Sequence, residues 1–255
     1  MSSKSSPTAD RGRFFIIGAQ RCGTTYLYEL LDEHPQVAMA RPKRPEPKWF
    51  LHAAQVALGP QAWKEALFPG VSGRLLGEKG TSYIEHPEAV ASILGVFPEA
   101  RFLVILREPV ARAISNYRFS VDNGVETLPL EKALSPESEG RPYDRQKIST
   151  SPFFYLRRSC YADYLTAWAA AVPRGRLHVV LFEELTRGKE TFPRLCRFLG
   201  LEPFEPPSLG RIVNAAAEPM PEISAELYSR LKEYFQEPNH RLEQFLGRSL
   251  DSWKG

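Results

Sequence analysis

The sequence lacks several features that mark large classes of proteins. Its three cysteines (Cys22, Cys160 and Cys196) are odd in number and far apart, so they form neither a metal-binding spacing nor an evident disulfide framework. No apolar run approaches the roughly 20 residues of a membrane span. The net charge is only +3, which argues against bulk nucleic-acid binding. These absences favour a globular protein of the reducing cytoplasm that holds no metal.

The domain organisation predicted from the sequence is simple. Residues 1–10 are polar and rich in serine and lack the apolar segment of a secretion signal, so we expect a disordered tail over 1–12. Hydrophobic residues make up 43% of the 255-residue chain. Residues 13–255 therefore suit one domain with a sizeable core. Nothing in the sequence indicates an oligomeric state.

Apolar runs alternate with amphipathic stretches along the chain. We expect strands at 14–17, 37–40, 75–78, 101–106 and 177–182, and helices at 24–33, 59–67, 87–96, from 109, from 151, and at 191–199, 222–235 and 239–246. The alternation predicts an α/β fold, with a central parallel sheet and helices on its faces. Ligands of such sheets bind at the carboxyl ends of the strands. The segments with candidate chemistry all fall there.

The loop Gly18–Thr25 has the pattern of a phosphate-binding loop, G-x-x-x-x-G-T-T. Its glycines allow backbone N–H groups to approach phosphate oxygens at a helix N-terminus, where Arg21 and two threonine hydroxyls add donors. The lysine that an NTP-binding loop carries before its Ser/Thr is absent, so we expect a different phosphate compound. The predicted contacts are Gln20, Arg21, Cys22, Gly23, Thr24 and Thr25, with Cys22 interpreted as a small residue that fills a tight turn.

A second candidate segment follows the buried strand 101–106. In ATP-using P-loop enzymes such a strand often ends in an aspartate that holds Mg²⁺. Here it ends in Arg107, which would bind an anion directly, and Ser115 lies about two turns into the next helix. By itself this pattern fits an arginine in a surface ion pair equally well.

Two further residues have the chemistry of group transfer. Glu46 lies between two prolines and beside aromatic residues, where a carboxylate can act as a general base. Lys79 follows an apolar run and can steady a transferred anionic group. Each residue alone also fits an ordinary surface position. The basic group Arg141, Arg145, Lys147, Arg157 and Arg158 could attract an anionic acceptor or form a solvated face.

In this order, the segments resemble the PAPS-dependent sulfotransferases, which use 3′-phosphoadenosine-5′-phosphosulfate. The heparan sulfate N- and 3-O-sulfotransferase domains and their bacterial counterparts are the most similar. The similarity rests on Gly18–Thr25, Glu78-Lys79, 104–109 with Ser115, 158–161, 231–239 and Gly247-Arg248. It implies a P-loop-like fold, a 5′-phosphosulfate held by 20–25 and a 3′-phosphate held by Arg107 and Ser115. It also implies Glu46, Lys79 and Arg21 as catalytic residues, and a second clamp on the donor at Asn214 and Ala215.

The expected activity is transfer of a sulfonyl group from PAPS to a hydroxyl, or secondarily an amine, of a carbohydrate or small molecule, with release of PAP. Two alternatives stay open. A P-loop kinase is disfavoured by the missing lysine and aspartate, and a non-catalytic module would bind PAP or a sulfated glycan. The acceptor cleft would be walled by aromatic residues that fit a core equally well, namely Trp49, Phe50, Tyr83, Phe153, Phe154 and Tyr155.

Overall fold

The computed structural model describes residues 12–144, 146, 150–211 and 223–253. Five strands form one sheet in the order β2-β3-β1-β4-β5, and all four neighbouring pairs are parallel. The strands are β1 (Arg13–Gly18), β2 (Val37–Met39), β3 (Leu75–Lys79), β4 (Arg101–Leu106) and β5 (Leu177–Leu181). The predicted parallel α/β sheet is therefore confirmed, and β1, which carries the glycine loop, lies at its centre.

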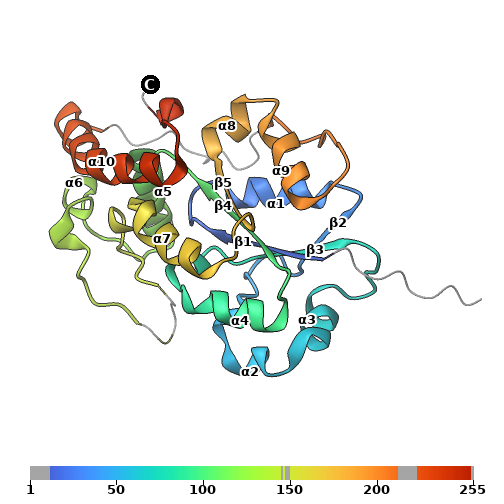
Figure 1. The fold of residues 1–255 in the computed structure, drawn as a ribbon. Helices are drawn as coiled ribbons and strands as arrows, with labels where there is room; N and C mark the ends of the chain where they lie inside the picture. Colours follow the sequence, from blue (N-terminus) through green and yellow to red (C-terminus); the bar gives the residue numbers. More distant parts are fainter. Residues whose placement is uncertain (1–11, 145, 147–149, 212–222, 254–255) are drawn as a thin grey trace, which may run out of the picture.

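Helices cover both faces of the sheet (Figure 1). On one side are α1 (Thr24–Asp32), α8 (Phe182–Arg187) and α9 (Thr191–Leu199), and on the other are α2 (Ala53–Val56), α3 (Gly59–Leu67) and α4 (Glu88–Val96). Because neither face meets water, β1 and β4 are almost continuously apolar. Phe15 of β1 stacks on Phe102 and meets Phe50 edge-on at 5.3 Å between ring centroids.

A second hydrophobic cluster lies beside the sheet. Its helices are α5 (Pro109–Asp122), α6 (Leu130–Ala133) and the long α10 (Ala225–Leu246). Helix α10 packs along α5 and also along α7 (Tyr161–Ala171), whose buried residues belong to the main core (Figure 1). Ile114 of α5, Tyr155, and Leu231 and Phe235 of α10 form its buried centre. This packing fixes α5, and with it the position of Ser115 next to the glycine loop.

The prediction that a helix begins at Ser151 is wrong, because α7 begins only at Tyr161. The amide groups of Leu156 and Arg157 donate to the carboxylate of Glu139, so they are taken out of a helical ladder. The buried Arg112 side chain donates to the carbonyl of Tyr155 and fixes the same segment in an irregular path. Long-range side-chain partners decided this boundary, and no local pattern shows them.

The C-terminal helices also differ from the prediction. Residues 225–246 form one helix, which continues through Pro238, although proline removes a backbone donor and breaks most helices. Leu231, Phe235, Pro238 and Leu242 are buried along one stripe, so tertiary packing offsets the lost hydrogen bond. The short helices α2 and α8 were not predicted.

Candidate functional site

The glycine turn joins β1 to α1 and fits tightly against the sheet. The amide of Ala19 donates to Ile105 of β4 at 2.8 Å, and the amide of Cys22 donates back to Ala19 at 3.2 Å. Gly23 has φ +88°, and a Cβ there would lie 2.3 Å from the ring of Phe182. Only glycine satisfies both constraints, so the second glycine of the motif is required by the fold.

Three arginines converge on this turn. Arg21 is itself left-handed, with φ 68°, and its Nε donates to Ser115 Oγ at 3.2 Å. Burial lowers the pKa of Arg21, and the like charges of Arg107 and Arg44 lower it further. None of the three forms an ion pair with a carboxylate within the described residues. An anion bound here would relieve their mutual repulsion.

The turn is supported by Arg158, which was predicted to attract an acceptor or lie on a solvated face, and by Cys22, which was predicted to fill the turn. Arg158 is buried, pairs with Glu85 at 2.9 Å and donates to Gln20 Oε1 at 2.6 Å, so it supports the turn and does not face an acceptor. The Cys22 thiol lies 3.4 Å from the hydroxyl of Tyr161 and is fully buried. Burial raises the pKa of Cys22, which fits a space-filling residue and not a reactive thiol.

Glu46 and Lys79 meet, although 33 positions separate them in the chain. Lys79 Nζ donates to Glu46 Oε1 at 2.8 Å, and both the amide and the hydroxyl of Thr81 donate to Oε2 at 2.8 Å. Lys79 is 4% exposed, whereas the Glu46 side chain is 14% exposed. Each carboxylate oxygen is therefore held while the group still reaches the surface. Thr81, which donates to the second carboxylate oxygen of Glu46, was not predicted as a site residue. The only sequence feature that could have indicated it is its position just after a strand end.

The neighbouring Glu78 points to the opposite side of β3 and is fully buried. It accepts hydrogen bonds from the amide of Trp49 at 3.2 Å, from Trp63 Nε1 at 2.6 Å and from the hydroxyl of Tyr83 at 2.6 Å. Burial raises the pKa of Glu78. These bonds anchor the 3₁₀ turn Trp49–Leu51 and so fix the end of the segment that carries Glu46.

One cavity of about 390 Å³ brings these groups together. It is lined by Gln20, Arg21, Thr24, Thr25, Arg44, Pro45, Glu46, Lys48, Lys79, Thr81 and Phe119. Arg107 and Ser115 stand behind Arg21 and do not line the cavity. Arg44, Lys48 and Phe119 were not predicted, although Arg44 and Lys48 flank Glu46 in the proline-rich loop. Asn214 and Ala215 lie outside the described residues, as do Arg145 and Lys147.

Most of the aromatic residues proposed as cleft walls belong to the core. Trp49, Tyr83 and Tyr155 are buried and hydrogen-bonded or packed within it. Phe153 and Phe154 are partly exposed, but they stack under Arg141 and Arg157.

Across the described ranges, no group of His, Cys, Asp or Glu is arranged to hold a metal ion. Nor does any described helix combine the length and apolarity needed to traverse a bilayer.

Fold and site together define a group-transfer protein with an anion-binding turn beside a carboxylate–lysine pair. The model of the sulfotransferase family matches residues 13–67 and 41–206, and the chain belongs to this family. Human heparan sulfate glucosamine 3-O-sulfotransferase 6 is 27% identical over 92% of this chain and 72% of its own length. Mouse heparan sulfate glucosamine 3-O-sulfotransferase 3A1 is also 27% identical, over 94% of this chain and 64% of its own length.

Solved structures agree with this assignment. A sulfotransferase from Alicyclobacillus acidocaldarius is 26% identical, with a TM-score of 0.74 over 96% of this chain and 99% of that one. The sulfotransferase domain from the curacin biosynthetic pathway shares the fold at 15% identity, with a TM-score of 0.54. The chain spans 64 to 72% of the length of the two heparan sulfate relatives.

Proposed function

We propose that this protein transfers a sulfonyl group from PAPS to a hydroxyl of a carbohydrate or small-molecule acceptor and releases PAP. The observation that carries the proposal is the placement of Glu46, Lys79 and Arg21 around one cavity. A carboxylate held by a lysine beside an arginine-bearing phosphate turn supplies a base, and cations for developing negative charge. An amine acceptor is the second choice.

The donor site suits a ligand with two separated anionic groups. The threonine hydroxyls and the start of α1 face the cavity with Arg21, which suits the 5′ end of PAPS. Arg107 and Ser115 stand behind Arg21, which suits the 3′-phosphate. When bound, PAPS supplies a sulfonyl group on a phosphate leaving group. Because arginines stand where P-loop NTPases place Mg²⁺ ligands, the proposal includes no metal.

In the proposed reaction Glu46 removes the proton of the acceptor hydroxyl. Lys79 and Thr81 keep the carboxylate in one orientation, so little rearrangement is needed when the acceptor arrives. An ammonium group has three donors, so Lys79 can hold Glu46 and also contact the oxygen that bridges sulfur and phosphorus. Arg21 lines the same cavity and would balance the charge on the leaving group.

The test is Glu46→Gln, assayed with ³⁵S-labelled PAPS against a panel of acceptors. Turnover should fall roughly 10²- to 10⁴-fold, the usual loss when a general base is removed. Calorimetry should find PAP affinity nearly unchanged. Glu99→Gln is the matched control, because the Glu99 side chain is 86% exposed and pairs with Arg176 outside both the donor cavity and its neighbouring cleft. Near-normal turnover in Glu46→Gln would remove Glu46 from the mechanism.

The same measurements separate the alternatives. A binding module would bind PAP tightly but modify no acceptor, and a kinase would bind ATP in a Mg²⁺-dependent manner. A cytoplasmic location is part of our proposal, since the three cysteines are buried and unpaired. Cell fractionation would test that location.

A further inference from the structure

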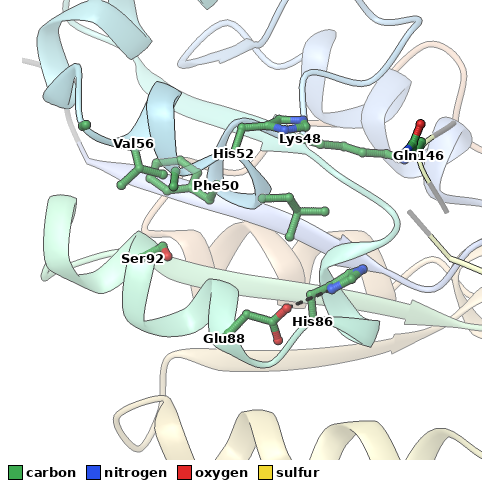
Figure 2. Close-up of a pocket in the computed structure, with 11 residues that line it drawn as sticks. Lys48, Phe50, His52, Val56, His86, Glu88, Ser92 and Gln146 are labelled. Carbon is green, nitrogen blue, oxygen red and sulfur yellow. Dashed lines mark hydrogen bonds and ion pairs between the residues drawn. The ribbon is translucent and has the colours of Figure 1, made fainter. Parts of the chain in front are cut away.

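A second and larger cleft adjoins the donor cavity, with a volume of about 840 Å³ (Figure 2). Lys48, two residues after Glu46, is common to both linings, so the cleft begins next to the reaction centre. Figure 2 shows Phe50 and Val56 on one side of the cleft, and His86 and Glu88 on the other. Its size falls within the roughly 300–1,000 Å³ typical of small-molecule sites.

The chemistry of this cleft differs from that of the donor cavity. Its apolar lining residues all come from the segment 50–57, namely Phe50, Leu51, Ala53, Val56 and Ala57, whereas His52, His86, Ser92 and Gln146 add polar groups. Lys48 and Glu88 are the charged groups among the described lining residues, and their formal charges offset each other. Glu88 is further occupied by a hydrogen bond at 2.9 Å with His86 Nδ1.

We propose that this cleft binds the non-reacting part of the acceptor, and that this part is an uncharged, mainly apolar body attached to the reacting alcohol. The inference rests on the proposed function, because it places the reacting hydroxyl at Glu46. Lys48, which lines both spaces, connects the cleft to the donor cavity, and the apolar residues of the segment 50–57 suit an apolar part of the acceptor. A polyanionic glycan would need several fixed cations along the cleft, and Lys48 is the only lysine or arginine among the described lining residues.

Chain length of the acceptor gives a direct test. Unbranched primary alcohols from ethanol to 1-decanol are compared as acceptors of the ³⁵S-labelled sulfonyl group from PAPS. An N-sulfated heparan oligosaccharide is tested alongside them as a polyanionic acceptor. If the cleft takes the alkyl chain, kcat/KM should rise about fourfold for each added methylene until the cleft is filled, which is the gain from burying one CH₂ group. The oligosaccharide should be a poor acceptor.

Val56→Lys places a charge within the apolar lining and should flatten the dependence on chain length. Ethanol turnover and PAP affinity should stay unchanged, because Val56 lines only the second cleft of the two. Asn239→Lys is the control, since it adds the same charge in a groove along α10. This variant should keep the full dependence on chain length.

These experiments distinguish a failure of the apolar-acceptor hypothesis from a failure of the proposed function. If PAP binds and turnover depends on Glu46, but chain length has no effect or the oligosaccharide is the preferred acceptor, the apolar acceptor is overturned and the proposed function stands. If PAP does not bind, the proposed function falls as well. A rising series that Val56→Lys flattens and Asn239→Lys preserves supports the inference.

Discussion

The arginines of the glycine turn and two arginines of the 123–160 segment, Arg141 and Arg158, are arranged in opposite ways. At the turn, burial and neighbouring arginines lower the pKa of Arg21. In the 123–160 segment, a bidentate contact with Glu126 raises the pKa of Arg141. Among the described residues, Arg21, Arg44 and Arg107 form no ion pair with a carboxylate, whereas Arg141 pairs with Glu126 and Arg158 pairs with Glu85. Among these arginines, those without a carboxylate partner lie at the candidate ligand site, and those with one support the fold.

The first way to sharpen this comparison is acid titration of the paired region. Burial alone would raise the pKa of Glu126, but hydrogen bonds from Arg141, the Leu128 amide and Tyr155 outweigh it and lower the pKa from 4.5 to about 2. A depressed carboxylate pKa stabilises the fold above pH 4.5, and this stability is lost as pH falls toward 2. The loss should be about 3 kcal/mol of unfolding free energy.

Denaturant unfolding between pH 7 and pH 2.5 would measure this loss in the wild type and in Glu126→Gln. The variant should be less stable at pH 7 and should lack this part of the acid dependence. An unchanged acid dependence in Glu126→Gln would show that the pair with Arg141 does not stabilise the folded state.

The second prediction concerns Arg107, one of the arginines at the glycine turn. Arg107→Met should weaken PAP binding roughly 10- to 150-fold, the range expected for losing charge-assisted hydrogen bonds to a phosphate. The unliganded protein should lose little stability, because the substitution also removes repulsion with Arg21.

Arg157→Met is a matched control for Arg107→Met. Each guanidinium lies 5.3 Å from a phenylalanine ring centroid, but Arg157 is exposed and outside the donor site. Calorimetric titration with PAP should distinguish the two variants clearly. Equal affinities would contradict the interpretation that Arg107 lies at the ligand site.

The third and smallest effect is expected from Glu78, a buried carboxylate that has no arginine partner among the described residues. Glu78→Gln cannot accept from all three of its donors, so the Trp49 amide and the nearby Glu46 segment should be held less firmly. We expect kcat to fall roughly tenfold, a barrier increase near 1.4 kcal/mol, with PAP affinity unchanged.

A split between kcat and PAP affinity would identify Glu78 as a positioning residue. Glu126→Gln serves again as the control, since it also removes a buried carboxylate but should leave kcat unchanged. A proportional loss of kcat and of folded protein in Glu78→Gln would instead indicate a purely structural role.

Much of the fold could be predicted from the sequence, because local patterns carry it. The strands 101–106 and 75–78 and the helices 59–67 and 191–199 match the observed elements closely. The start of α7 could not be predicted, since Glu139 and Arg112 set it through contacts distant in sequence. The continuity of α10 through Pro238 could not be predicted either. Proline usually ends a helix, and here the burial of one face of the helix keeps it intact.

The candidate site divides in the same way. Gln20 to Thr25 are consecutive, so their meeting at one helix N-terminus follows from the local motif. Glu46 and Lys79 were selected individually, but nothing in the sequence indicated that Lys79 and Thr81 would hold the Glu46 carboxylate. Arg44 was not predicted as a site residue, because a flanking basic residue in a loop is most often solvated.

The sequence by itself determined a parallel sheet, with a phosphate turn after its first strand and an arginine at the end of the strand 101–106. Short-range periodicity and glycine geometry are sufficient for these features. Only the tertiary structure decided which charges are paired, which aromatic residues are core and where the second cleft lies. Charge pairing and burial depend on which distant segments meet, and that outcome is set by packing of the whole chain.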